Sequence, residues 1–381
     1  MVSSPKTEQL RVLLWSPKGA GRQYGGPGMN AWRLYSALPN GSLAVSLLHG
    51  SSEQETVQPF SPIVSIWPKD RYGLLGKLLL GIHASLWITK NRAKFDVFHG
   101  LAGYWTTLLP ALAAKMVGMA VVIKIAGEGT ETTLSGEQRF QWLRRGRHRL
   151  LKHIDAVVAI SDSIEARLLD LGVDRRRIHR IPNGVNTEVF YPAVAQEPRI
   201  REDPIVLFCG AIVPRKRPHL LVNVLKCQGM ETISLWVAGP RSDEAYASSI
   251  FRLAHSLGVA DRVRWLGFVQ ETAPLYRHVD IVCLPSRSEG MANVLLEAMA
   301  SGCPFVATMA SGVEELAATG AGIVAGETAD EIATALRLGL KKREQMGEAG
   351  LDAVNRIYSS TVIAENYLAL FRRLVRSDDS V

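Results

Sequence analysis

The sequence is poor in cysteine, in aromatic residues and in long apolar runs, and each shortage narrows the class of protein. Four cysteines lie among apolar or small neighbours without C-x-x-C spacing, so we expect buried reduced thiols rather than disulfides or zinc: Cys209, Cys227, Cys283 and Cys303. Hydrophobic residues make up 47% of the 381-residue chain and charged residues 21%, which excludes disorder and collagen-like repeats. At about 150 residues per domain, the length predicts two or three globular domains.

No segment reads as a membrane span or as an export signal. The most apolar stretch, residues 72–89, contains three glycines and is interrupted by Lys77 and His83. The first residues lack the basic region, long apolar run and small-residue cleavage site of a signal peptide. We therefore expect a cytoplasmic protein, with a peripheral position on the cytoplasmic face of the membrane as an open alternative.

Acidic residues fall short of basic residues only in the first half of the chain. Residues 1–192 hold 24 Lys and Arg against 14 Asp and Glu, whereas residues 193–381 hold 20 against 22. The formal net charge of +8 therefore comes from the N-terminal half. Such an excess predicts that this half meets an anionic partner.

Short apolar runs alternate with helix-like stretches along the chain, which is typical of βαβ units on parallel sheets. A stretch with three prolines and few core positions, residues 190–204, divides these runs into two sets, and we expect the linker at residues 193–204. We predict an α/β protein with domains at residues 1–192 and 205–359. The expected strands are residues 11–16, 44–48, 97–99, 120–125, 156–160 and 178–181, then 205–209, 234–238, 262–266, 281–284 and 304–308.

Residues 284–302 combine an apolar run, a turn and a helix that Gly302 and the following proline end. The first amide groups of this helix, at residues 291–293, would form a site for a phosphate. Glu289 precedes the helix, and Glu297 follows eight residues later, about 12 Å away along a helix. Two carboxylates beside an anion site can accept hydrogen bonds from ligand hydroxyls. The alternative is that Glu289 only caps the helix and Glu297 is solvated.

Four segments match motifs of one family in the family's own order. Residues 181–192 resemble an I-x-N-G-V-D…F-x-P segment, and residues 208–216 resemble a G-R-L-V-x-x-K-G loop. Residues 265–269 resemble the strand before a donor site, and residues 284–302 resemble an E-x7-E segment. The chain thus resembles, over most of its length, the retaining GT-B glycosyltransferases of the glycosyl transferases group 1 family, also called family 4.

The resemblance implies two facing Rossmann-like domains with parallel sheets, and a C-terminal helix, about residues 360–381, that crosses back to the first domain. It implies that Glu289 faces the transferred sugar, that Glu297 binds ribose hydroxyls, and that Lys216 neutralises the diphosphate leaving group. Without its motif, Lys216 would read as a surface lysine in a basic run. Further donor-binding residues expected from the resemblance are Gly210, Arg215, Arg217, Val269, Gly290, Met291, Ala292 and Asn293.

The donor site of this family works without Mg²⁺, and the sequence contains no Asp-x-Asp metal motif of other glycosyltransferases. We therefore expect no metal and no cofactor, with the nucleotide sugar as substrate. The chain departs from the family pattern at Ala211, where an arginine is usual, and at Ala126, where many members carry a histidine. Arg215 or Arg217 is a candidate to replace the missing arginine, and a loop at Gly127 to replace the missing histidine.

The N-terminal domain holds further candidates. Gly25 and Gly26 match a Gly-Gly pair that approaches the donor phosphate, although a plain flexible turn explains them too. As a dinucleotide fingerprint this loop fails, because its glycine spacing is wrong. His99 ends an expected strand and resembles a D-x-x-H residue that lines the family's cleft; a structural role at the strand end is the alternative.

The basic excess is densest at residues 139–153, which hold six Lys and Arg. Apolar residues between the charges would form one face of an amphipathic helix, as in helices that lie on anionic lipid. A solvated helix face and nucleic-acid contact are the rivals, and the latter lacks any accompanying fold signature. The arginines assigned to this acceptor or membrane contact are Arg144, Arg145, Arg147 and Arg149.

The resemblance implies an enzyme that transfers a sugar, with retention, from a UDP- or GDP-sugar to a carbohydrate or lipid-linked acceptor in cell-surface glycan biosynthesis. The alternative enzyme is a nucleotide-sugar 2-epimerase, which shares the two-domain architecture. A catalytically silent protein that binds a nucleotide sugar or glycolipid is the alternative from another class, because of Ala211 and Ala126. We expect no nucleic-acid partner.

Overall fold

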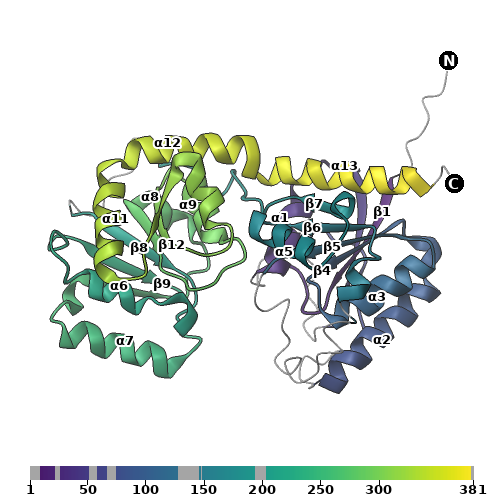
Figure 1. Ribbon diagram of the computed structural model, residues 1–381, viewed down its shortest axis with the longest axis horizontal. Helices are drawn as coiled ribbons and strands as arrows, with labels where there is room; N and C mark the ends of the chain where they lie inside the picture. The colour runs from purple at the N-terminus through teal and green to yellow at the C-terminus, as the bar shows by residue number, and fades with distance from the viewer. Residues whose placement is uncertain are drawn as a thin grey trace, which may run out of the picture. The chain divides into compact units, whose positions relative to one another are not determined.

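The computed structural model describes residues 9–21, 26–50, 58–66, 74–127, 146, 148–193 and 203–378. The chain divides into two compact units, each with its own parallel sheet (Figure 1). Unit 1 comprises Met1–Asn183 and Ser360–Val381, and unit 2 comprises Gly184–Ser359. Most of the expected linker, residues 194–202, lies outside the described residues.

The boundary between the units differs from the one drawn on the sequence. Residues 184–192, placed in the first domain by the sequence, belong to unit 2. The reason is a backbone contact: Val185 N–H donates to the carbonyl of Tyr358 at 2.9 Å, and Val185 pairs with Ser359 in an isolated parallel bridge. The chain therefore enters and leaves unit 2 through two segments that hydrogen-bond to each other.

Unit 1 is built on a seven-stranded sheet in the order β3-β2-β1-β4-β5-β6-β7. Its strands are almost continuously buried apolar runs, as expected for a parallel sheet covered on both faces. The strands are β1 (Leu10–Ser16), β2 (Leu43–His49), β3 (Ile63–Ser65), β4 (Val97–Leu101), β5 (Ala120–Ile125), β6 (Ala156–Ala159) and β7 (Ile178–Arg180). The helices are α1 (Pro27–Ser36), α2 (Leu74–Lys90), α3 (Trp105–Met116), α5 (Asp162–Asp170) and α13 (Ser360–Asp378), with short 3-10 turns η1 (Arg92–Lys94) and η3 (Arg175–Arg177).

The C-terminal helix α13 is part of the core of unit 1. Its buried face carries Ile363, Tyr367 and Phe371, which join a cluster with residues of β1, β4, β5 and α1. Helix α13 also packs against α1 and β5. The last residues of the chain therefore complete a domain that the first residues begin.

Unit 2 is built on a six-stranded parallel sheet in the order β10-β9-β8-β11-β12-β13. The strands are β8 (Ile205–Cys209), β9 (Ser234–Ala238), β10 (Val263–Gly267), β11 (Ile281–Leu284), β12 (Phe305–Thr308) and β13 (Gly322–Ala325). The helices are α6 (His219–Val224), α7 (Glu244–Ser256), α8 (Ala273–His278), α9 (Asn293–Ala300), α10 (Val313–Leu316), α11 (Ala329–Lys341) and α12 (Arg343–Ala353). The short turns are η4 (Pro214–Lys216), η5 (Ala260–Arg262), η6 (Ala317–Ala321) and η7 (Val354–Tyr358).

The order of strands in unit 2 reverses beside β8. The chain runs from β8 outward through β9 to β10, and then returns to the other side of β8 with β11. The carboxyl ends of β8 and β11 therefore form the topological switch point, where open α/β sheets bind their ligands. The loops after these two strands hold the predicted donor-site residues.

Candidate functional site

Three neighbouring strands of unit 2 end in glycines whose backbones approach closely. Gly210 N–H donates to the carbonyl of Ala238 at 2.8 Å, and Gly239 N–H donates to the carbonyl of Gly267 at 2.7 Å. A Cβ atom at Gly239 would lie 1.9 Å from the carbonyl oxygen of Gly210, so no side chain fits there. The sequence analysis predicted only Gly210. The signal for the other two is their place directly after the expected strands 234–238 and 262–266.

Lys216 and Glu289, which the resemblance assigns to one donor site, meet at the switch point. Lys216 ends η4 in the loop after β8, and its Nζ lies 3.1 Å from Oε1 of Glu289 in the loop after β11. The lysine side chain lies against Gly210, where a Cβ would come within 3.1 Å of Nζ. Both charged side chains are nearly buried, with 12% and 11% of their surface exposed. The site therefore holds a fixed cation beside a fixed carboxylate.

Arg215 places a second cation on the same carboxylate. Its guanidinium lies 3.3 Å from Oε1 of Glu289 and donates to the carbonyl of Ser288 at 2.9 Å. The backbone joins the same loops, because Arg287 N–H donates to the carbonyl of Arg215 at 2.8 Å. Unlike Lys216, Arg215 is half exposed, so its guanidinium can turn toward an anion at the surface.

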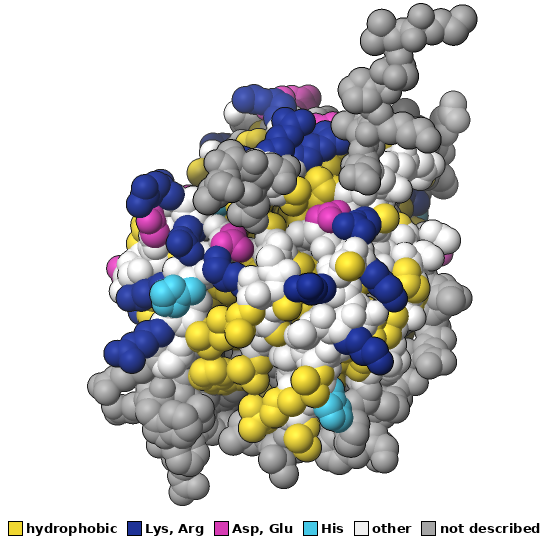
Figure 2. All heavy atoms as spheres, turned by 90° about the vertical axis from the view of Figure 1, so that its right-hand side faces the viewer, with side chains coloured by type: hydrophobic (Ala, Val, Ile, Leu, Met, Phe, Trp, Pro, Cys, Tyr) yellow, Lys and Arg dark blue, Asp and Glu magenta, His cyan; other side chains and the backbone are white. Residues whose placement is uncertain are grey.

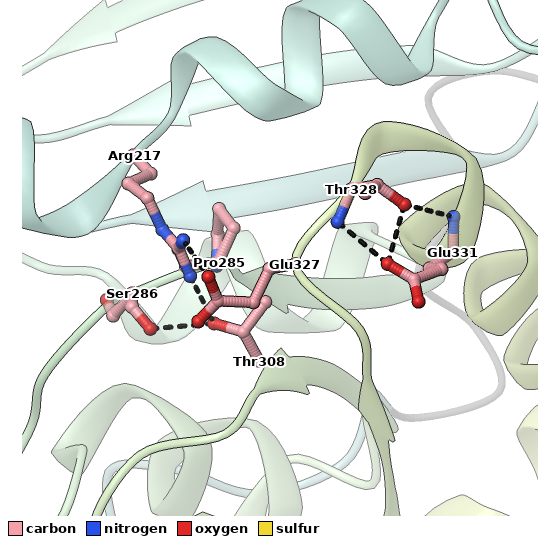
Figure 3. A network of polar contacts seen from close by, with 7 residues as sticks. All are labelled: Arg217, Pro285, Ser286, Thr308, Glu327, Thr328 and Glu331. Atoms are coloured by element: carbon pink, nitrogen blue, oxygen red, sulfur yellow. Dashed lines mark hydrogen bonds and ion pairs between the residues drawn. The ribbon is translucent and has the colours of Figure 1, made fainter.

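The guanidinium of Arg217 hydrogen-bonds to loops of unit 2. These contacts argue against its predicted role in binding donor phosphate. Its guanidinium is buried and donates to the carbonyl of Pro285 at 2.7 Å and to Thr308 Oγ1 at 3.3 Å (Figure 3). It also pairs with Glu327 at 3.1 Å. Thr308 Oγ1 in turn donates to the carbonyl of Ser286 at 2.6 Å. The network thus fastens the loops after β8, β11, β12 and β13.

The backbone at Arg217 adopts a conformation that favours glycine, with φ at +50°. We expect Arg217→Ala to lower the free energy of unfolding by about 2–4 kcal/mol, because a buried charged network loses its donor. Arg217→Gly loses the same contacts but relieves the backbone strain, so it should be about 1 kcal/mol more stable than the alanine variant. Urea midpoints of the two variants would measure this difference. If the alanine variant were as stable as the glycine variant, the backbone at residue 217 would not be strained.

Glu297 lies in the interior, contrary to the alternative of a solvated helix face. It belongs to α9, which packs against α8, α12 and β12, and only 7% of the residue is exposed. Tyr276 of α8 donates its hydroxyl to Oε2 of Glu297 at 2.8 Å. Ala292, which precedes α9, has no polar side chain with which to cap the first amide groups of the helix.

Tyr276 and Cys209 surround Glu297 with neutral groups. Burial raises the pKa of Tyr276 well above its usual value, and the nearby Cys209 and Glu297 raise it further. Burial, followed by the charge of Glu297, raises the pKa of the Cys209 thiol to about 12. Tyr276 therefore acts as a hydrogen-bond donor that positions the carboxylate. The sequence analysis missed Tyr276, since one tyrosine in a short helix carries no motif.

The remaining predicted donor-site residues line the same loops. Met291 and Ala292 are buried, and Gly290 touches the loop after β12, where a Cβ at Gly312 would lie 3.2 Å from its carbonyl oxygen. Asn293 begins α9, and Val269 lies half-buried two residues after β10. The structure thus brings these residues to the carboxyl edge of one sheet.

In unit 1 the structure corrects the expectation for His99. The residue is fully buried in β4, where its Nδ1 lies 2.7 Å from the hydroxyl of Tyr35 and its ring packs against Tyr367 and Phe371 of α13. Burial, followed by the charge of Lys124, lowers the pKa of His99 to about 3. A fully buried ring cannot contact an acceptor, so its role is structural.

The other predicted residues of unit 1 are only partly described. Gly26 precedes α1 with φ at +54°, its carbonyl accepts from Asn30 N–H at 3.1 Å, and Gly127 is half-buried after β5. Arg149 is exposed on a helical turn. Gly25, Arg144, Arg145 and Arg147 lie outside the described residues. Within the described ranges, no three His, Cys, Asp or Glu residues cluster as metal ligands would, and the expectation of a metal-free site stays a prediction.

Two family models match the chain. The model "Glycosyl transferases group 1" matches residues 193–352, and the model "Glycosyl transferase 4-like domain" matches residues 25–184. Together they span most of the sequence and divide it close to the boundary between the units. The chain belongs to the glycosyl transferases group 1 family. This member carries Ala211 beside its glycine, and Arg215 supplies the second cation that reaches Glu289.

Curated relatives include D-inositol 3-phosphate glycosyltransferases. The one from Mycobacterium marinum is 32% identical over 204 residues, which are 50% of this chain and 43% of the relative. One from Catenulispora acidiphila is 30% identical over 227 residues, which are 55% of this chain and 53% of the relative. The chain thus spans about half the length of the curated relatives it matches.

Solved structures share the fold over nearly the whole chain. Sucrose-phosphate synthase from Thermosynechococcus elongatus gives a TM-score of 0.79 at 19% identity, covering 97% of this chain and 100% of that one. Anabaena HepE in complex with UDP and glucose gives 0.74 at 16% identity, covering 96% and 100%. The lipopolysaccharide glycosyltransferase WaaG gives 0.72 at 17% identity, covering 94% and 99%. The two parallel-sheet, Rossmann-like units are those of the GT-B class.

Proposed function

We propose that this protein is a retaining glycosyltransferase that moves a sugar from a UDP- or GDP-sugar to a carbohydrate or lipid-linked acceptor in cell-surface glycan biosynthesis. The observation that carries the proposal is the meeting of Lys216, Arg215 and Glu289 at the switch point of unit 2, next to the start of α9. Membership of the family and a fold shared with a UDP-bound structure support a nucleotide sugar as donor.

The charges at this site suit a diphosphate. Lys216 has three N–H donors, so it can hold Glu289 and a phosphate oxygen together. Two cations share one carboxylate, and the local charge is therefore positive before the donor binds. As the glycosidic bond breaks, negative charge grows on the leaving diphosphate. A fixed lysine stabilises that charge more in the transition state than in the ground state.

Glu289 and Glu297 would serve the two ends of the donor. In this proposal Glu289 faces the transferred sugar, and Glu297 accepts hydrogen bonds from the ribose hydroxyls. The contact from Tyr276 holds the Glu297 carboxylate in one orientation, which lowers the entropic cost of binding. The site needs no metal, because Lys216 and the amide groups before α9 supply the positive charge.

We expect Glu297→Ala to weaken donor binding about tenfold to a hundredfold, since two charged hydrogen bonds to ribose are lost. Tyr276→Phe removes only the positioning contact, so it should weaken binding a few-fold at most.

Glu289→Gln should lower turnover with little change in affinity. Calorimetry and initial rates measure the two quantities separately. Unchanged binding and unchanged rates in both glutamate variants would contradict the assignment of Glu289 and Glu297 to the donor site.

A panel of UDP-, GDP- and ADP-sugars tests the function itself. We expect one donor to release free nucleotide, faster when the right acceptor is present, and NMR of the product to show the retained anomeric configuration. An inverted product would contradict the retaining mechanism. A 2-epimerised sugar would favour the epimerase. Donor binding without nucleotide release would favour a silent binding protein, as the alanine at position 211 first suggested.

A further inference from the structure

The outward face of helix α2 in unit 1 is apolar. Leu78, Ile82 and Leu86 are 45%, 42% and 64% exposed, and their four-residue spacing places them on one side of the helix. Leu79 beside them is also exposed. This apolar face, which consists of these four residues, spans about 12 Å along the helix. Such side chains lie outward singly on many soluble proteins, but a continuous row marks an interaction surface.

The helix is held firmly in place by its other face. Ala84 and Ile88 are fully buried, and α2 packs along α3, where Gly81 lies against Leu109. The apolar face therefore points away from the core of unit 1. The buried face also means that α2 does not cross a bilayer. Within the residues that the structure describes, no helix is long and apolar enough to do so.

Among the described residues, positive charge accompanies this apolar face and negative charge does not. Helix α2 contains no acidic residue, and Lys77, Lys90, Arg92 and Lys94 are exposed on it and on the turn that follows. Among the described residues, none of these four cations forms an ion pair. The one carboxylate between residues 74 and 118, Asp96, is bonded to Arg11. Figure 2 shows hydrophobic side chains gathered low on this side of the molecule, with Lys and Arg side chains near them.

We propose that α2 is a docking surface for an anionic lipid bilayer, with its apolar face inserted into the interface and Lys90, Arg92 and Lys94 at the headgroups. An apolar row with cations and no carboxylates is the chemistry of interfacial helices. A second copy of the chain is a poor occupant, because a symmetric contact would bring the cations of both copies together without compensating carboxylates. The inference is independent of sugar transfer and differs from the basic segment at residues 139–153.

Vesicle co-sedimentation of the full chain, without donor or acceptor, tests the surface. We expect binding to vesicles of phosphatidylcholine mixed with phosphatidylglycerol, and weak binding to phosphatidylcholine alone. The variant Ile82→Gln with Leu86→Gln keeps good helix formers and should lower the partition coefficient about tenfold. Lys90→Glu with Arg92→Glu should lower it at least as much on anionic vesicles.

Matched controls lie elsewhere on unit 1. Leu169→Gln on α5 removes another exposed leucine, and Arg372→Glu on α13 reverses another exposed charge. Both should leave the partition coefficient within about twofold, and circular dichroism should show every variant folded. Equal binding by the α2 variants and the wild type would overturn the proposal. So would a wild-type dimer that the Ile82 and Leu86 variant converts to monomer, because the second copy would then be the occupant.

Discussion

Replacing Lys216 by alanine is expected to lower the turnover number about a hundred- to a thousandfold, the usual cost of losing one fixed group that stabilises transition-state charge. Lys216 is nearly buried, lies against Gly210, and contacts the carboxylate of Glu289 at 3.1 Å. Arg215 remains after the substitution, so donor affinity should fall less than turnover. Initial rates at saturating donor, together with calorimetric dissociation constants, separate the two effects.

Two further variants make this test specific. Lys216→Arg keeps the charge but changes its shape and reach, so it should restore only part of the rate. Lys226→Ala removes an exposed lysine of the same unit and should leave the kinetics unchanged. If Lys216→Ala turned over within about threefold of the wild type while still folded, Lys216 would not be the group that stabilises the leaving diphosphate.

Unit 1 should lose stability steeply in acid because of His99. Burial lowers the pKa of this residue from 6.5 to about 3, so the folded state keeps it neutral while the unfolded state binds a proton below about pH 6.5. Keeping His99 neutral therefore costs no stability above that pH, and the free energy of unfolding decreases as the pH falls below it. The loss reaches about 1.4 kcal/mol per pH unit, or roughly 5 kcal/mol over the whole interval.

The variant His99→Asn removes the titrating ring from β4. We expect its urea midpoint to fall less steeply than that of the wild type between about pH 6 and about pH 4, even if the variant is less stable near neutrality. His153→Asn, which replaces an exposed histidine of unit 1, is the matched control. Parallel wild-type and His99→Asn curves would mean that the ring is not held neutral by the fold.

The strands were predictable from the sequence because parallel strands covered on both faces are apolar runs. All eleven expected strands are present in the structure, with ends that differ by at most two residues. The two that were missed, β3 and β13, lie at sheet edges and are three and four residues long. Ile63 and Ile323 lie in runs too short to separate from a loop, and only pairing with β2 and β12 makes them strands.

Candidate site residues could be named where short segments resemble the family's motifs. The resemblance supplied Lys216 and Glu289 as candidates from two such segments, and the structure places them in contact. Whether a site residue is buried could not be predicted in the same way. Glu297 could equally have been solvated, because the packing of α9 against α8 and α12 depends on segments distant in the chain. The role of Tyr276 follows only from its hydrogen bond to Glu297 in the structure.

The sequence by itself determined the α/β class, the division into two sheets and the family, and it supplied candidate residues for the donor site. Local apolar periodicity and short motifs encode these features within a few residues. Only the tertiary structure decided that Arg217 fastens four loops, that His99 belongs to the core, and that α2 presents leucines to solvent. Each of those outcomes depends on which distant side chains bury a residue, and a linear pattern does not contain that information.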